Sequence, residues 1–108
     1  METRIKRITS ILDEKKAQDI EVINLSSKSY ITDYVIITTA LNNKHSLSLV
    51  NILKDELKPL GEEFIMTEEE EDWSIIDLGD IIIHIMTQNY REKYNLEEFL
   101  SKLDEPMV

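Results

Sequence analysis

The sequence contains no cysteine, and among its 108 residues there are only two glycines, two prolines and one tryptophan. Without cysteine the chain forms neither disulfides nor a cysteine-based metal site, which is typical of a protein in a reducing compartment. It also lacks the Gly-x-Gly-x-x-Gly, Walker-type, His-Glu-x-x-His and Gly-x-Ser-x-Gly motifs. Phosphate-binding loops, zinc-peptidase sites and nucleophile elbows therefore have no sequence support.

Long apolar runs and an excess of positive charge are also missing. No segment approaches the roughly 20 apolar residues needed to span a bilayer, and the first residues lack the apolar core of a signal peptide. We expect a soluble, cytoplasmic protein without membrane contact. The net charge is -10, from 22 acidic and 12 basic residues, which argues against direct nucleic-acid binding. A basic protein surface is the more natural partner.

The length and the apolar periodicity predict one α/β domain over residues 1–108. Helices are predicted over 3–16, over 43–60 with a stop at Gly61, and from Asn95, as an N-cap paired with Glu98, to Leu103. Strands are predicted over 19–25, 34–39, 64–66, 73–78 and 81–86, with loops at 26–29 and 68–72. A helix between the second and third strands allows a crossover, so we expect a mixed five-stranded sheet flanked by helices. Residues 104–108 are expected to fray.

The clearest local signal is the stretch from Trp73 to Met86. Two β-branched runs flank Gly79-Asp80, a typical two-residue hairpin turn. Because side chains alternate with a period of two, Ile75 should lie opposite His84, and Trp73 opposite Met86. One face is then almost purely aliphatic, with Ser74, Ile76, Leu78, Ile81, Ile83 and Ile85. The other face carries Trp73, Asp77 and His84 among Ile75, Ile82 and Met86, and such polar groups either find partners in the fold or bind something.

Acid–base chemistry has three candidates in this hairpin, namely Asp77, Asp80 and His84. Asp77 and His84 share a face one pair apart, which would allow a carboxylate–imidazole general base. The alternatives are a structural histidine and two turn-forming aspartates. Ser74 points to the opposite face, and a Ser–His–Asp triad is therefore excluded.

Other features have two interpretations each. Trp73 is either a core residue or an exposed interface anchor. The acidic segment 68–72 is either a solvated loop or a region that steers a basic partner. Tyr90, Tyr94 and Arg91 form either a C-terminal clasp over the sheet or part of a contact surface.

Four segments, taken in order, resemble the ribosomal silencing factor family, also called RsfS or Iojap. The segments are Asp19–Ser26, Thr32–Thr38, Trp73–His84 and Arg91–Glu97. The Trp-to-His hairpin and the Arg-x-x-Tyr-x-Leu-Glu ending are the most specific of them. The chain departs from the family pattern at Phe99, where a second tryptophan is usual, and at 68–72, where glycines are usual.

The resemblance implies a non-enzymatic factor, without cofactor or metal, that binds the large ribosomal subunit through large-subunit ribosomal protein fourteen. It would sterically block joining of the small subunit and so lower translation during starvation or stationary phase. It also implies a nucleotidyltransferase-like sheet without the catalytic signature, and a homodimer off the ribosome. The matching positions predict these partner-binding residues: Trp73, Ile75, Ile76, Asp77, Leu78, Asp80, His84, Tyr34, Arg91 and Tyr94. The alternative is a nucleotidyltransferase-like enzyme that binds a nucleotide or a divalent metal through Asp77, Asp80 and His84.

Overall fold

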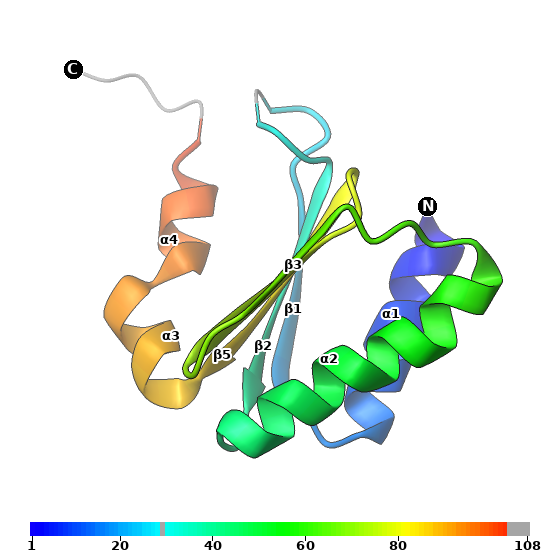
Figure 1. The fold of residues 1–108 in the computed structure, drawn as a ribbon. Coiled ribbons are helices and arrows are strands. Elements are labelled where there is room, and N and C mark those ends of the chain that lie inside the picture. Colours follow the sequence, from blue (N-terminus) through cyan, green and yellow to red (C-terminus); the bar gives the residue numbers. More distant parts are fainter. Residues whose placement is uncertain (29, 104–108) are drawn as a thin grey trace.

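The computed structural model describes residues 1–28 and 30–103, which form a three-layered α/β structure (Figure 1). The elements are α1 (Glu2–Glu14), β1 (Gln18–Asn24), β2 (Tyr34–Ala40), α2 (Asn43–Leu57), the short 3-10 helix η1 (Lys58–Leu60), β3 (Met66–Glu69), β4 (Trp73–Asp77), β5 (Ile81–Thr87), α3 (Gln88–Tyr94) and α4 (Leu96–Ser101). Helices α1 and α2 lie on one side of the sheet, and α3 and α4 lie on the other. Position 29 of the predicted loop and the predicted frayed tail, 104–108, lie outside the described residues.

The sheet is mixed, with the strand order β1-β2-β5-β4-β3. Strands β2 and β5 pair in parallel at its centre, and the other three pairings are antiparallel. The predicted mixed five-stranded sheet flanked by helices is therefore confirmed. Every residue of β2 except Tyr34 is buried, as expected of a continuous β-branched run that is covered on both faces.

The β4–β5 hairpin has the predicted register. Ile75 pairs with His84, and Trp73 pairs with Met86. The backbone N–H of Leu78 donates to the carbonyl of Ile81 at 2.9 Å and closes the turn. Gly79 adopts φ +93° in this turn, a left-handed conformation that costs other residues about 1 kcal/mol or more. The turn thus fixes which side chains of the hairpin face each side of the sheet.

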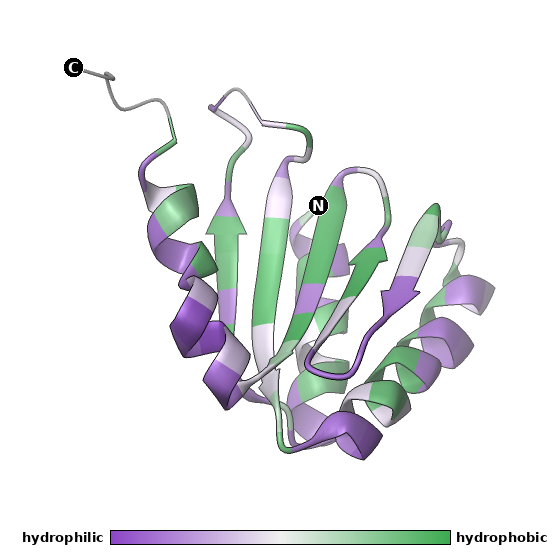
Figure 2. Ribbon diagram, turned by 60° about the vertical axis from the view of Figure 1, so that its left-hand side comes forward, coloured by the Kyte–Doolittle hydropathy of each residue, from purple (hydrophilic) through white to green (hydrophobic). Residues whose placement is uncertain are grey.

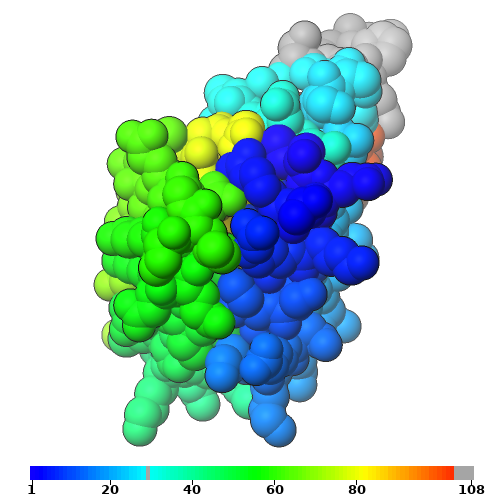
Figure 3. Space-filling model, turned by 90° about the vertical axis from the view of Figure 1, so that its right-hand side faces the viewer, coloured from blue at the N-terminus to red at the C-terminus, as the bar shows by residue number. Residues whose placement is uncertain are grey.

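The aliphatic face of the hairpin forms the main core with α1 and α2, which lie side by side over it (Figure 3). Its fully buried members include Ile8 and Leu12 of α1, Leu49 and Leu53 of α2, and Ile76, Ile83 and Ile85 of the hairpin. The one polar residue on this face, Ser74, accepts a hydrogen bond from the Ser46 hydroxyl of α2 at 3.2 Å. A buried hydroxyl is therefore tolerated here because it is paired.

Strand β3 lies further along the chain than predicted. It runs from Met66 to Glu69 instead of 64–66, so that Glu68 pairs with Ile75 and Glu69 with Ser74 of β4. Two residues of the predicted acidic loop 68–72 are thus strand residues. Because β3 is an edge strand, its glutamates remain in water while their backbone pairs with β4, and charged residues are common on such edges.

Helix α3 was not among the predicted helices. Its sequence is polar, and its only apolar positions are Tyr90 and Tyr94, so no aliphatic stripe marks it. Asn95 is the N-cap residue of α4 and pairs with Glu98, as predicted, but its side chain does not form the hydrogen bond of a capping box. Asn95 adopts a left-handed conformation (φ 43°) that ends α3, and its side-chain amide donates to the Glu98 carboxylate instead of bonding to the backbone of α4. The last helix itself is confirmed over Leu96–Ser101.

Candidate docking surface

The second face of the sheet is covered only in part. Helices α3 and α4 pack over β1 and β2, where they bury residues such as Leu25, Val35 and Ile37. Figure 2 shows these helices toward the β1 side, and no described helix lies in front of β4 and β3 in that view. Helix α3 also reaches the end of β5, where Met86 is buried. The pairing of β3, β4 and β5 puts eight side chains on this side of the sheet, of which Ile82 and Met86 are buried. The other six are partly or fully exposed and are here called the open face: Met66, Glu68, Trp73, Ile75, Asp77 and His84.

Trp73 is held in place by a row of rings. Its indole Nε1–H donates to Nδ1 of His84 at 3.0 Å, and the two rings are 5.8 Å apart. The ring of Tyr94 lies 5.2 Å from Trp73, and that of Tyr90 lies 5.5 Å from Tyr94. Tilted ring pairs at such distances are favourable. The row therefore joins α3 to the hairpin and orients an indole that stays partly exposed.

An acidic hollow lies beside Trp73. Glu68, Glu70, Glu71 and Asp72, here called the acidic rim, line it together with Trp73, Ile75 and Tyr90. The Asp72 carboxylate accepts from the Thr87 hydroxyl at 3.0 Å, which ties the rim to the end of β5. The surface thus combines aromatic and aliphatic groups with carboxylates, a composition that suits a basic protein partner.

The predicted pairing of Asp77 with His84 is wrong. The Asp77 carboxylate accepts from the backbone N–H of Gly79 at 2.8 Å, because an aspartate readily bonds the backbone two residues on in a turn. The third candidate, Asp80, forms a double ion pair with Arg4 of α1 at 2.6 and 3.0 Å, and this guanidinium lowers the pKa of Asp80. No cluster of three potential metal ligands occurs in residues 1–28 and 30–103.

His84 is neutral in this structure. Burial lowers its pKa to about 4, since an apolar environment disfavours the imidazolium. Its Nδ1 accepts from Trp73, so the hydrogen of the neutral ring is on Nε2. This supports the interpretation of His84 as a hydrogen-bonded partner of Trp73.

We expect His84 to make stability depend on pH. Between pH 6.5 and pH 4 the unfolded chain binds a proton at His84 that the folded chain does not bind. The free energy of unfolding should therefore fall as the pH falls through this window, by up to about 3 kcal/mol. Urea unfolding of the wild type and of His84→Gln at pH 7, 5.5 and 4 measures this contribution. A difference between the two proteins that stays constant over this range would contradict it.

Five predicted partner-binding residues lie away from the open face: Asp80, which pairs with Arg4, the buried Arg91, and Ile76, Leu78 and Tyr34. Ile76 and Leu78 are 0% and 6% exposed beneath the helices, and have no surface to offer a partner in this structure. The alternation of the hairpin already put both on the aliphatic face. Tyr34 packs on the α1 side of the sheet, where it lines a shallow hollow with Ile5 and Val22. The sequence motif therefore combines residues from both faces.

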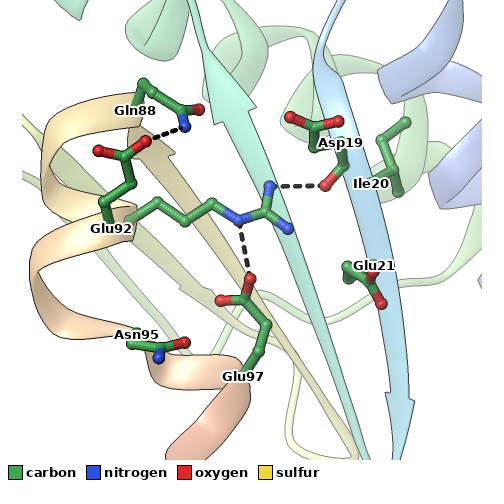
Figure 4. Close-up of a pocket in the computed structure, with 8 residues that line it drawn as sticks. Asp19, Ile20, Glu21, Gln88, Glu92, Asn95 and Glu97 are labelled. Carbon is green, nitrogen blue, oxygen red and sulfur yellow. Dashed lines mark hydrogen bonds and ion pairs between the residues drawn. The ribbon is translucent and has the colours of Figure 1, made fainter.

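Arg91 is a clasp over the sheet, one of its two predicted interpretations. It is buried, and it bonds to Asp19 of β1 and Glu97 of α4, which Figure 4 shows on opposite sides of a hollow. Its Nη1 donates to the Asp19 carbonyl at 2.6 Å and to the Thr39 hydroxyl at 2.9 Å, and its Nε donates to Glu97 at 3.1 Å. One side chain thereby joins α3, α4, β1 and β2. It also holds Asp19 in a left-handed conformation (φ 47°) beside an irregularity in β1.

Two residues of the open face were missed from the sequence, Met66 and Glu68. Met66 was assigned to the end of a strand and Glu68 to a loop. The two were therefore not recognised as residues of one strand that point to the same face, with Thr67 between them. A strand predicted over 66–69 would have put Met66 opposite Asp77 and Glu68 opposite Ile75. Met66 is 41% exposed and extends the apolar part of the open face toward the edge of the sheet.

Comparison with known proteins extends these observations. The chain matches the family described as "Ribosomal silencing factor during starvation" over residues 1–106. It is 32% identical to the ribosomal silencing factor RsfS of Zymomonas mobilis, across 98% of this chain and 84% of that protein. A mouse protein, "Mitochondrial assembly of ribosomal large subunit protein 1", is 30% identical across 87% of this chain but 43% of its own length. A crystal structure from Chromobacterium violaceum, 25% identical, superposes with a TM-score of 0.83 and covers 95% of this chain and 87% of that one. Among the described residues, no helix has the length and apolarity to cross a membrane.

Proposed function

The chain belongs to the ribosomal silencing factor family, and from this premise we propose that it is a non-enzymatic, cytoplasmic repressor of translation. It binds the large ribosomal subunit through large-subunit ribosomal protein fourteen. There it sterically blocks joining of the small subunit during starvation or stationary phase. The names of the bacterial and mouse relatives, which refer to ribosome silencing and to assembly of the large subunit, support this proposal.

The observation that carries the proposal is the open face. It presents a partly exposed indole, held by His84 and Tyr94, beside the acidic rim. Aromatic anchors of this kind carry much of the binding energy in protein interfaces. A net charge of -10 favours approach to a basic protein. Of the predicted contact residues we retain Trp73, Ile75, Asp77, His84 and Tyr94.

The alternative, a nucleotide- or metal-binding enzyme, draws no support from the geometry. Asp77 caps the hairpin turn, Asp80 pairs with Arg4, and His84 accepts from Trp73. The three candidate side chains thus have three separate partners instead of one shared site.

Co-sedimentation with separated ribosomal subunits tests the proposed function. We expect the protein to pellet with large subunits and not with small ones, and to lower the yield of joined ribosomes when both are mixed. Binding should weaken as the salt concentration rises, because the acidic rim and a basic partner attract one another through water. Protein that pellets with neither subunit at micromolar concentration and low salt would refute the proposal. Light scattering of the free protein tests the homodimer that the family resemblance implies.

A further inference from the structure

His84 lies within the open face and uses one of its two ring nitrogens inside the chain. Its strand neighbours are Ile37 of β2 and Ile75 of β4. Nδ1 accepts from Trp73, while Nε2 has no hydrogen-bond partner among the described residues. Among the described residues, only Oε1 of Glu97 is a side-chain nitrogen or oxygen that is both fully buried and without a hydrogen-bond partner. Nε2 of His84 is not such an atom and is therefore not fully buried, although most of the ring is.

The bond from Trp73 fixes what this second nitrogen can do. An indole nitrogen only donates, so Nδ1 of His84 must be the acceptor and carries no hydrogen. The neutral ring then has its hydrogen on Nε2, which makes that atom a donor and nothing else. Around it the face is apolar, with Ile75, Ile82 and Met86 as neighbours in the ladder. A hydrogen bond formed here would be shielded from water once a partner covered the face.

We propose that His84 is a specificity-determining residue of the docking surface. Its Nε2–H donates to an oxygen of the bound protein, and its Nδ1 holds the indole of Trp73 in the orientation that the partner meets. This inference rests on the proposed function, because it requires a protein to cover the open face. A directional donor rejects a partner that places an N–H group at the same point, whereas the acidic rim attracts basic proteins without regard to such detail.

Substitutions that imitate each ring nitrogen separate the two roles. In His84→Asn, the amide oxygen lies close to the former Nδ1 and can still accept from Trp73, but nothing reaches the position of Nε2. His84→Gln places an amide near Nε2 and leaves the indole without its acceptor, and His84→Phe removes both functions. We expect His84→Asn to weaken binding to isolated large subunits about tenfold. His84→Phe should bind more weakly than His84→Gln.

Nuclear magnetic resonance provides a readout that a purely structural role would not produce. The chain has one tryptophan, so a single indole N–H signal reports on the bond to His84. That signal should be preserved in His84→Asn and shifted in His84→Phe. In the wild type, the ¹⁵N shifts of the imidazole should show hydrogen on Nε2 and none on Nδ1. The opposite tautomer would overturn the inference without reference to any ribosome.

The second histidine supplies a matched control. Both ring nitrogens of His45 have partners inside the chain, the N–H of Leu41 and the carbonyl of Lys15, so His45→Asn should bind large subunits like the wild type. A His84→Asn variant that keeps its indole signal and also binds like the wild type would overturn the assignment of His84 alone. Wild-type protein that binds neither subunit would overturn the proposed function, and with it the docking role of His84.

Discussion

Replacing Arg91 by methionine is expected to lower the free energy of unfolding by about 3 kcal/mol. Methionine keeps the aliphatic length of the side chain but leaves the carbonyl of Asp19, the hydroxyl of Thr39 and the carboxylate of Glu97 without their donor. Glu97 already has one buried oxygen without a partner, so its charge would be poorly compensated. Removing one member of a buried ionic network typically costs this much. Urea denaturation monitored by circular dichroism measures the loss.

Two further variants make the Arg91 experiment specific. Arg91→Lys keeps the charge but cannot reach all three acceptors, and we expect a stability between those of wild type and Arg91→Met. Lys54→Met removes a cation from a partly exposed ion pair with Glu69 and should change stability little. Equal stabilities of Arg91→Met and Lys54→Met would show that the clasp does not hold the C-terminal helices on the sheet.

Replacing Trp73 by alanine is expected to weaken binding to the large ribosomal subunit by about 2 kcal/mol or more, which is roughly 30-fold. The variant loses the indole, its bond to His84 and its contact with Tyr94 at once. The acidic rim would remain, so residual binding should be weak and strongly dependent on salt. Co-sedimentation titrations at two salt concentrations measure both effects.

Folding and binding must be separated in the Trp73 experiment. Trp73→Phe keeps an aromatic ring in contact with Tyr94 but has no donor for His84, so its affinity should lie between those of wild type and Trp73→Ala. Ile31→Ala removes an apolar side chain that is 81% exposed in the loop after β1, and should leave binding unchanged. A folded Trp73→Ala protein that binds as tightly as Ile31→Ala would show that the open face is not the docking surface.

The β4–β5 hairpin could be predicted in detail because its signals agree. The turn at Gly79, the β-branched runs and the period of two all require one register, and the structure has it. The same alternation put Ile76 and Leu78 on the buried face. Local sequence therefore determined which hairpin residues are available to a partner, even though the family motif includes both faces.

The partners of the polar residues could not be predicted in this way. Asp77 and His84 lie on one face, but a backbone donor two residues away and an indole on the neighbouring strand compete for them. Arg91 pairs with atoms 72 and 52 residues away along the chain, and no local pattern encodes such distances. Helix α3 escaped detection for a related reason, because its packing depends on two tyrosines and a buried arginine in place of an aliphatic stripe.

The parallel pairing of β2 with β5 has a consequence for the order of folding. On one side of this parallel pair, β1 pairs with β2. On the other side, β3 pairs with β4 and β4 pairs with β5. Because these strands are neighbours in the sequence, each antiparallel group can form locally. The parallel pairing joins residues 34–40 to residues 81–87, and closing so long a loop is slow. During synthesis, β2 therefore emerges with one edge unpaired until β5 follows. We expect nascent chains that end before residue 81 to aggregate readily, since that edge carries Val35, Ile36 and Ile37.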